Sequence, residues 1–181
     1  MLRKSQNVSG RYESGFAESI RLFRTGGEEA RLPPIHILAD DYEVLADIVC
    51  RSESATPGVA LLWRELQRAE ILDTDQPPGG LIHLNSTVRY TDLVNPRPQT
   101  VRLIGSAVHA RPRRGLSVAS PVGAALIGLQ VGDRFPWMAA GNRMRMVRVE
   151  RVETDPFEVA RREAARAADR RRLIKELLSA R

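Results

Sequence analysis

Residues 117–133 read SVASPVGAALIGLQVGD and predict a short helix set between two strands. Ser120 is placed to cap the helix, and Pro121 suits its first position because that backbone nitrogen needs no hydrogen bond. Gly128 suits the end of the helix, and Gly132-Asp133 favours a tight turn before the next strand. These signals predict a small sheet packed on one short helix.

The sequence around this helix, residues 78–152, has the two-residue apolar period of strands. The alternation is seen at residues 88–91, 101–103, 116–118 and 135–137. In residues 143–152 the apolar positions change parity between Met146 and Val147, which a bulge there or a strand buried on both faces would explain. Turns rich in proline, glycine and arginine separate the strands, so an antiparallel sheet is expected.

The clearest boundary in the chain is the Pro-Pro-Gly-Gly run at residues 77–80. Before it, helical apolar spacing predicts helices over about 40–51 and 58–72, the first capped by Asp40 or Asp41. The short break between them requires the helices to lie antiparallel. Residues 33–77 are therefore predicted to form a helical hairpin roughly 20 Å long.

The two ends of the chain are expected to be accessory segments. Residues 1–32 have scattered charge and glycine and are predicted to be a mobile arm. Residues 153–181 begin with a helix-start signal at Asp155-Pro156 and then lack glycine and proline, which predicts a long charged helix. That helix could be a solvated tail, an oligomer contact or an anion-binding element. The expected fold class is α+β.

The charge of the chain is strongly polarised. The 28 basic and 22 acidic side chains leave a net charge of +6, but residues 33–77 carry −6 and residues 78–152 carry +8. Complementary patches of this kind favour a charged protein partner, because they speed and orient encounter. The single cysteine excludes a disulfide scaffold, and no apolar run is long enough to span a membrane. A cytoplasmic protein without a metal or other cofactor is expected.

Two strings carry a resemblance to a known family: LNSTVRY at residues 84–90 and the 117–133 string quoted above. Over about residues 33–152 the chain resembles the GreA/GreB transcript-cleavage factors, and within them the Rnk type, the regulators of nucleoside diphosphate kinase. The resemblance implies an FKBP-like sheet domain behind an N-terminal helical hairpin. It also implies binding to RNA polymerase near the secondary channel, and no enzymatic activity of the chain's own.

The hairpin departs from the pattern of the cleavage factors, which hold a catalytic magnesium ion with acidic residues at the tip of a long coiled coil. The tip loop here offers only Glu53, with Arg51 close by, whereas a hard divalent ion calls for a pair of carboxylates. The hairpin is also short. The sequence therefore predicts polymerase binding without stimulation of cleavage, in possible competition with a cleavage factor.

Partner contacts are expected at two places in the sheet domain. In the family, the loop that matches Ser120, Pro121 and Val122 lies at the polymerase contact, although helix capping alone would equally explain the first two. Three arginines crowded in one turn are further candidates, and equally they could form a solvated loop: Arg111, Arg113 and Arg114.

Two other functions remain open. Nonspecific, salt-sensitive nucleic-acid binding would use the +8 charge of residues 78–152 and the arginine-rich residues 161–172, without aromatic stacking platforms. A prolyl isomerase of the FKBP type is the enzyme alternative, but it needs an apolar pocket lined by several aromatics. The sheet segment supplies only Tyr90, Phe135 and Trp137.

Overall fold

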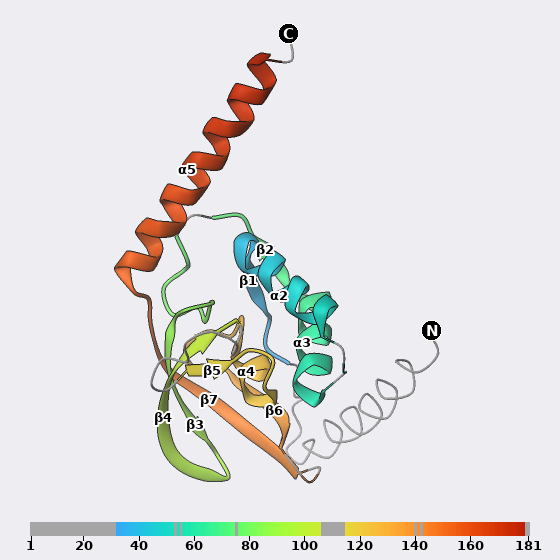
Figure 1. The fold of residues 1–181 in the computed structure, drawn as a ribbon. Coiled ribbons are helices and arrows are strands. Elements are labelled where there is room, and N and C mark those ends of the chain that lie inside the picture. Colours follow the sequence, from blue (N-terminus) through green and yellow to red (C-terminus); the bar gives the residue numbers. More distant parts are fainter. Residues whose placement is uncertain are drawn as a thin grey trace.

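The computed structural model describes residues 32–52, 54, 56–74, 76–105, 115–139, 141 and 143–179. Its elements form a mixed α+β fold in which a curled sheet is accompanied by four helices (Figure 1). In chain order they are β1 His36–Leu38, α2 Ala39–Arg51, α3 Pro57–Arg68, β2 Glu70–Leu72, β3 Thr87–Asp92, β4 Asn95–Ile104, β5 Gly115–Ser117, α4 Pro121–Leu126, β6 Arg134–Ala139, β7 Arg143–Glu153 and α5 Pro156–Ser179. The predicted arm lies outside the described residues, apart from Leu32.

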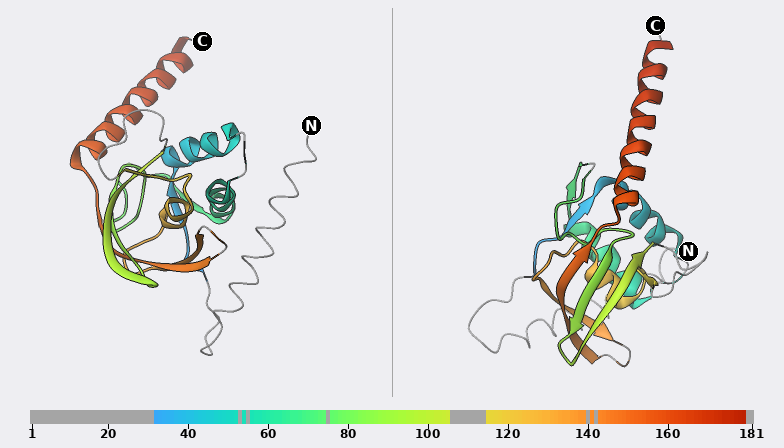
Figure 2. Two further views of the ribbon diagram at one scale, coloured as in Figure 1. Left: turned by 60° about the horizontal axis from the view of Figure 1, so that its bottom comes forward. Right: turned by 90° about the vertical axis from the view of Figure 1, so that its left-hand side faces the viewer.

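The main sheet has five strands in the order β5-β4-β3-β7-β6. The pairs β4-β3, β3-β7 and β7-β6 are antiparallel, as predicted. The β4-β5 pair is parallel, with Arg102 opposite Gly115, so the prediction of a wholly antiparallel sheet is wrong at this edge. In the left view of Figure 2 the sheet curls around α4, which lies in its hollow.

The irregularity of β7 lies at a different place from the one predicted. Pairing of β7 with β6 is continuous through residues 146 and 147. On the other side the register with β3 shifts between Arg89 and Tyr90, where Glu150 is the extra residue of β7. The bulge is therefore at Glu150. Because the pattern of apolar residues reports burial and not pairing, it could not locate the bulge.

Residues 36–72 form a β-α-α-β unit instead of helices alone. The first predicted helix is confirmed as α2, but the second ends at Arg68 and residues 70–72 form β2, which pairs in parallel with β1. A parallel pair needs a crossover of a dozen or more residues, and α2 and α3 supply it. The prediction that helix continues to residue 72 is therefore wrong.

The two helices of this unit touch each other and cross. In the left view of Figure 2, α3 is seen along its axis while α2 lies across the view. A side-by-side antiparallel hairpin is thus not confirmed. Asp40 and Asp41 lie within the first turn of α2 and do not cap it, because Leu38 occupies the cap position and makes no side-chain cap bond.

One apolar core joins the β-α-α-β unit to the main sheet. It includes Leu45 and Leu61 from the helices and Val88 and Phe135 from the sheet, all fully buried. Gly128, which has φ +79°, follows α4 at this junction, and a Cβ there would lie 2.5 Å from the side chain of Ile35. Only glycine fits, so the predicted helix stop also serves as a packing point.

Candidate functional site

The loop from β5 into α4 is held in place by Ser120. Its hydroxyl donates to the carbonyl of Ser117 at 2.6 Å and accepts from the backbone N–H of Gly123 at 3.2 Å. The predicted cap is confirmed, and Pro121 occupies the start of the helix. The proton of Ser120 is already used inside the loop, and Val122 packs partly buried against the core. Pro121, which is partly exposed, is therefore the side chain of the three that is best placed for a partner.

The start of α3 packs against the same loop through Gly58. A Cβ at this position would lie 2.1 Å from the carbonyl oxygen of Ala119 and 2.6 Å from the carbonyl carbon of Ser120. The helix is capped by Thr56, whose hydroxyl accepts from the N–H of Val59 at 3.3 Å. Sequence reasoning interpreted residues 52–58 as a helix break and the tip loop of the hairpin, although Thr-Pro-Gly is also a helix-start signal.

For the other residues that were predicted to contact a partner, the structure gives no contact with this loop. Arg51 is exposed at the end of α2 and bonds Asp47 within the same helix, at 2.5 Å. Glu53 lies outside the described residues, as do the three arginines of the turn at 111–114. Their predicted roles stay predictions.

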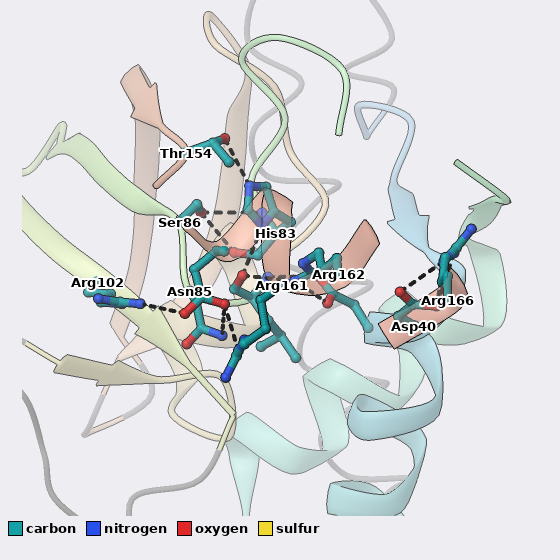
Figure 3. Close-up of polar contacts among 12 residues, drawn as sticks. Asp40, His83, Asn85, Ser86, Arg102, Thr154, Arg161, Arg162 and Arg166 are labelled. Atoms are coloured by element: carbon teal, nitrogen blue, oxygen red, sulfur yellow. Dashed lines mark hydrogen bonds and ion pairs between the residues drawn. The ribbon is translucent and has the colours of Figure 1, made fainter. Parts of the chain in front are cut away.

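A second cluster, which the sequence did not predict, joins α5 to the body (Figure 3). Arg162 reaches the carboxylate of Asp41 at 2.7 Å and donates to the carbonyl of Leu84 at 3.1 Å. The same carboxylate accepts from the backbone N–H of Leu84 at 2.7 Å. Arg166 reaches Asp40 and Asp73, each at 3.0 Å. We call these five residues the α5 clasp: Asp40, Asp41, Asp73, Arg162 and Arg166.

His83 lies beneath the clasp and is 2% exposed. Its Nδ1 is 2.8 Å from the carbonyl oxygen of Leu84, and its Nε2 is 2.9 Å from the hydroxyl of Thr154. A carbonyl only accepts, so Nδ1 carries the proton of the neutral ring and Nε2 accepts from Thr154. Burial lowers the pKa of His83 and raises the pKa of Asp41, the latter against the opposing effect of Arg162.

These shifts predict how stability depends on pH. The unfolded chain protonates His83 near pH 6.5, whereas the folded protein keeps the ring neutral to lower pH. The stability due to His83 is therefore complete above about pH 6.5 and is lost below it, by at most about 1.4 kcal/mol per pH unit. Asp41 acts in the opposite direction, because its raised pKa lets the folded protein bind a proton first.

Urea unfolding between about pH 7.5 and 5.5 tests this prediction. The free energy of unfolding of the wild-type protein should fall more steeply with acidification than that of His83→Gln. Asp41 is present in both proteins, so the comparison removes the part of its contribution that does not depend on the charge of His83. Parallel curves would contradict the assignment of a buried neutral His83.

A cleft of about 570 Å³ lies between α2 and α5. Its lining is mostly charged and includes Asp40, Glu43, Arg162 and Arg166.

Elsewhere four sheet-domain arginines have carboxylate partners: Arg89 with Glu150, Arg102 with Glu158, Arg145 with Asp92, and Arg151 with Glu153. Asp92 and Glu150 are already counted in the +8 of residues 78–152, whereas Glu153 and Glu158 lie outside that segment and neutralise part of it.

Comparison with known proteins identifies the family. Residues 77–154 match the model for the C-terminal part of transcription elongation factor GreA/GreB. A regulator of nucleoside diphosphate kinase from Escherichia coli K12 is 33% identical over 123 residues, which are 66% of this chain and 90% of that protein. The chain belongs to the GreA/GreB family. Transcription elongation factor GreA of Chloroflexus aggregans is 43% identical over 72 residues, 38% of this chain and 44% of that protein.

A solved structure extends the likeness to the fold. The prokaryotic transcription elongation factor GreA/GreB from Nitrosomonas europaea is 30% identical, covers 67% of this chain and 99% of its own, and superposes with a TM-score of 0.52. The GreA/GreB relatives named here are regulators or transcription factors, and none is a classical enzyme. Across the part of the chain that the structure describes, no helix is long and apolar enough to cross a membrane.

The GreA/GreB family model covers the Ser120 loop but none of the five residues of the α5 clasp. The family model ends at residue 154, and α5 begins at Pro156. Asp40, Asp41 and Asp73 lie before the start of the match, at residue 77. The clasp therefore joins two parts of the chain that lie outside the matched segment.

Proposed function

We propose that this GreA/GreB-family protein binds RNA polymerase near its secondary channel and modulates access to it without stimulating transcript cleavage. One observation carries the proposal: the family string at 117–133 forms a loop fixed from both sides. Ser120 fixes it from within and Gly58 of α3 packs on it from outside. A rigid segment that presents the partly exposed Pro121, with Val122 beside it packed partly against the core, loses little conformational entropy on binding.

Two features support the absence of cleavage stimulation. The 13 residues of α2 and the 12 of α3 give helices of only about 20 and 18 Å. Because they cross, neither extends the other into a long projection. The loop between them contains a single carboxylate in its sequence, where a divalent ion would need at least two.

Replacing Pro121 by glutamate should weaken polymerase binding by at least about tenfold, because a charge is placed at the centre of the proposed contact. The fold should survive, since glutamate is acceptable in the first turn of a helix. The measurement is the affinity of immobilised bacterial RNA polymerase for the purified full-length protein, followed by competition with a GreA factor.

The matched control is Pro156→Glu, which makes the same change at the first position of another helix, α5. It should bind as the wild-type protein does. Equal affinities for both variants and wild type would refute docking through Pro121. Transcript cleavage stimulated by the wild-type protein would refute the second half of the proposal.

Nonspecific nucleic-acid binding is the second candidate, and one feature favours it. Arg134 and Arg148 lie directly opposite each other on β6 and β7, and both are exposed. Like charges in this position repel, so an anion between them would be stabilising. Binding to duplex DNA that weakens steeply as the salt concentration rises, and that Arg134→Glu abolishes, would place nucleic acid ahead of polymerase.

The isomerase alternative finds little support in the aromatic residues. Phe135 is 0% exposed and Tyr90 4% exposed, so both are part of the core. The hydroxyl of Tyr90 donates to the side chain of Gln99 at 3.1 Å. The cleft described above is lined by charged side chains in place of the aromatics that a proline-binding pocket requires.

A further inference from the structure

The helix α5 is attached to the body without burying any side chain. It has 24 residues, about 36 Å of helix, and none of them is buried. In Figure 1 its first half lies beside the body and its second half extends away from it. The apolar residues of the second half are 50–70% exposed: Leu173, Ile174, Leu177 and Leu178. Apolar packing therefore does not fix the position of α5.

The described bonds between α5 and the body are polar. The inner one joins Arg162 to Asp41, whose side chains are 12% and 4% exposed. The outer ones join Arg166 to Asp40 and to Asp73, with Asp73 89% exposed. Glu158 adds a contact with Arg102 at 3.1 Å and a weaker one with Asn85 at 3.4 Å, and Glu163 accepts from Gln76 at 3.3 Å.

An interface of this composition is easily reversible. When α5 moves away as a unit, both members of each ion pair regain water together, so no charge is left buried and unpaired. Salt screens the attraction of Arg166 to Asp40 and Asp73, and screens the more buried Arg162–Asp41 pair less strongly. An apolar contact is not screened by salt. Attachment of α5 should therefore depend on ionic strength far more than the folding of the sheet does.

The attached half of α5 covers a defined surface. Beneath it are the first turn of α2 and the turn at residues 83–86, which includes part of the LNSTVRY string. Asn85 in that turn has φ +69°, a conformation that asparagine tolerates better than most residues. Figure 3 shows Arg162 and Arg166 pointing from α5 toward this surface. Removal of α5 would expose the carboxylate of Asp41 and would take the arginine partner away from Asp40 and Asp73, which are already partly or largely exposed.

We propose that α5 is a detachable strap, closed over the first turn of α2 and the 83–86 turn by the α5 clasp and opened when the clasp is screened or outcompeted. The closed strap neutralises the acidic surface of the β-α-α-β unit. The open strap exposes that surface and frees two arginines for an acidic competitor. This device does not depend on polymerase binding, so it stands or falls separately from the proposed function.

A distance measurement between two spin labels tests the strap in the full-length protein. Cys50 is the single cysteine of the chain and is exposed on α2, and Ser179→Cys supplies the second label at the end of α5. Arg166→Glu places a carboxylate against Asp40 and Asp73. This variant should raise, by at least about fivefold, the fraction of molecules in which the distance between the two labels differs from that of the closed strap.

The matched control is Arg172→Glu, which makes the same charge change on α5. Arg172 bonds Glu176 within the helix at 3.0 Å, so this variant should keep the closed distance. Adding Asp40→Arg to Arg166→Glu should restore closure. Raising the salt to about 1 M should open the wild-type strap without any substitution.

Either of two results would overturn the proposal. One is a distance distribution for Arg166→Glu that equals that of Arg172→Glu. The other is a wild-type distance that stays unchanged up to about 1 M salt. The salt experiment needs no variant and therefore decides the question even if Arg166→Glu disturbs folding. In that case α5 would be a fixed part of the body.

Discussion

Replacing Gly123 by alanine is expected to lower the free energy of unfolding by about 3 kcal/mol or more, enough to unfold a marginally stable domain. A Cβ at this position would lie 2.0 Å from the carbonyl oxygen of Ser117 and 2.9 Å from the hydroxyl oxygen of Ser120. The backbone would have to move, because a carbonyl oxygen cannot rotate away as a flexible side chain can. The movement would also break the cap that holds the loop.

Thermal and urea unfolding of Gly123→Ala measure this effect, with Gly79→Ala as the matched control. No atom lies within 4 Å of the Cβ position at Gly79. The control should therefore be neutral or slightly stabilising, since alanine restricts the unfolded chain. If both variants unfold at the same urea concentration, backbone contact at Gly123 is not what shapes the loop.

The loop that includes Gly123 could be predicted because its determinants are local. Ser120, Pro121 and Gly128 act within one or two turns of α4, so their roles follow from residue type and spacing. The same holds for the start of α5, which is set by Asp155. The carboxylate of Asp155 accepts from the backbone N–H of Phe157 at 3.0 Å. Elements defined by local hydrogen bonds are those that a single sequence reveals.

The failures of prediction lie where distant segments meet. Residues 70–72 continue the apolar spacing of α3, yet they pair with β1, more than thirty residues away. Period alone does not separate a short strand from a helix end. Asp41 has the residue type and position of a helix cap, but its carboxylate accepts from Leu84 and binds Arg162. No local signal indicates a bond across 121 positions.

The parts of the candidate site also differ in whether the sequence predicts them. The Ser120 loop follows from the sequence, whereas Gly58 joins it through tertiary packing that spacing does not show. The α5 clasp was hidden because each of its aspartates and arginines resembles an ordinary solvated charge. Only the fold shows that the −6 segment and the C-terminal helix neutralise each other at this surface.

Glu65 is the second position at which a single substitution should have a large effect. Its side chain is 1% exposed and accepts from two arginines of the same helix, Arg64 at 2.8 Å and Arg68 at 2.6 Å. Arg68 also donates to the carbonyl of Pro33 at 2.7 Å and lies over the ring of Phe135, 5.8 Å from its centre. Glu65 thus holds a guanidinium that joins α3 to the segment just before β1 and to the core.

Removing this carboxylate should cost about 3 kcal/mol of unfolding free energy, because breaking a buried ion pair leaves a charge uncompensated. Urea unfolding of Glu65→Ala measures the loss, and Gln67→Ala, an exposed truncation of similar size on the same helix, is the control. Arg68→Ala should add little to Glu65→Ala, since the two side chains act as a unit. Additive losses would instead show that each side chain stabilises the protein through separate packing contacts.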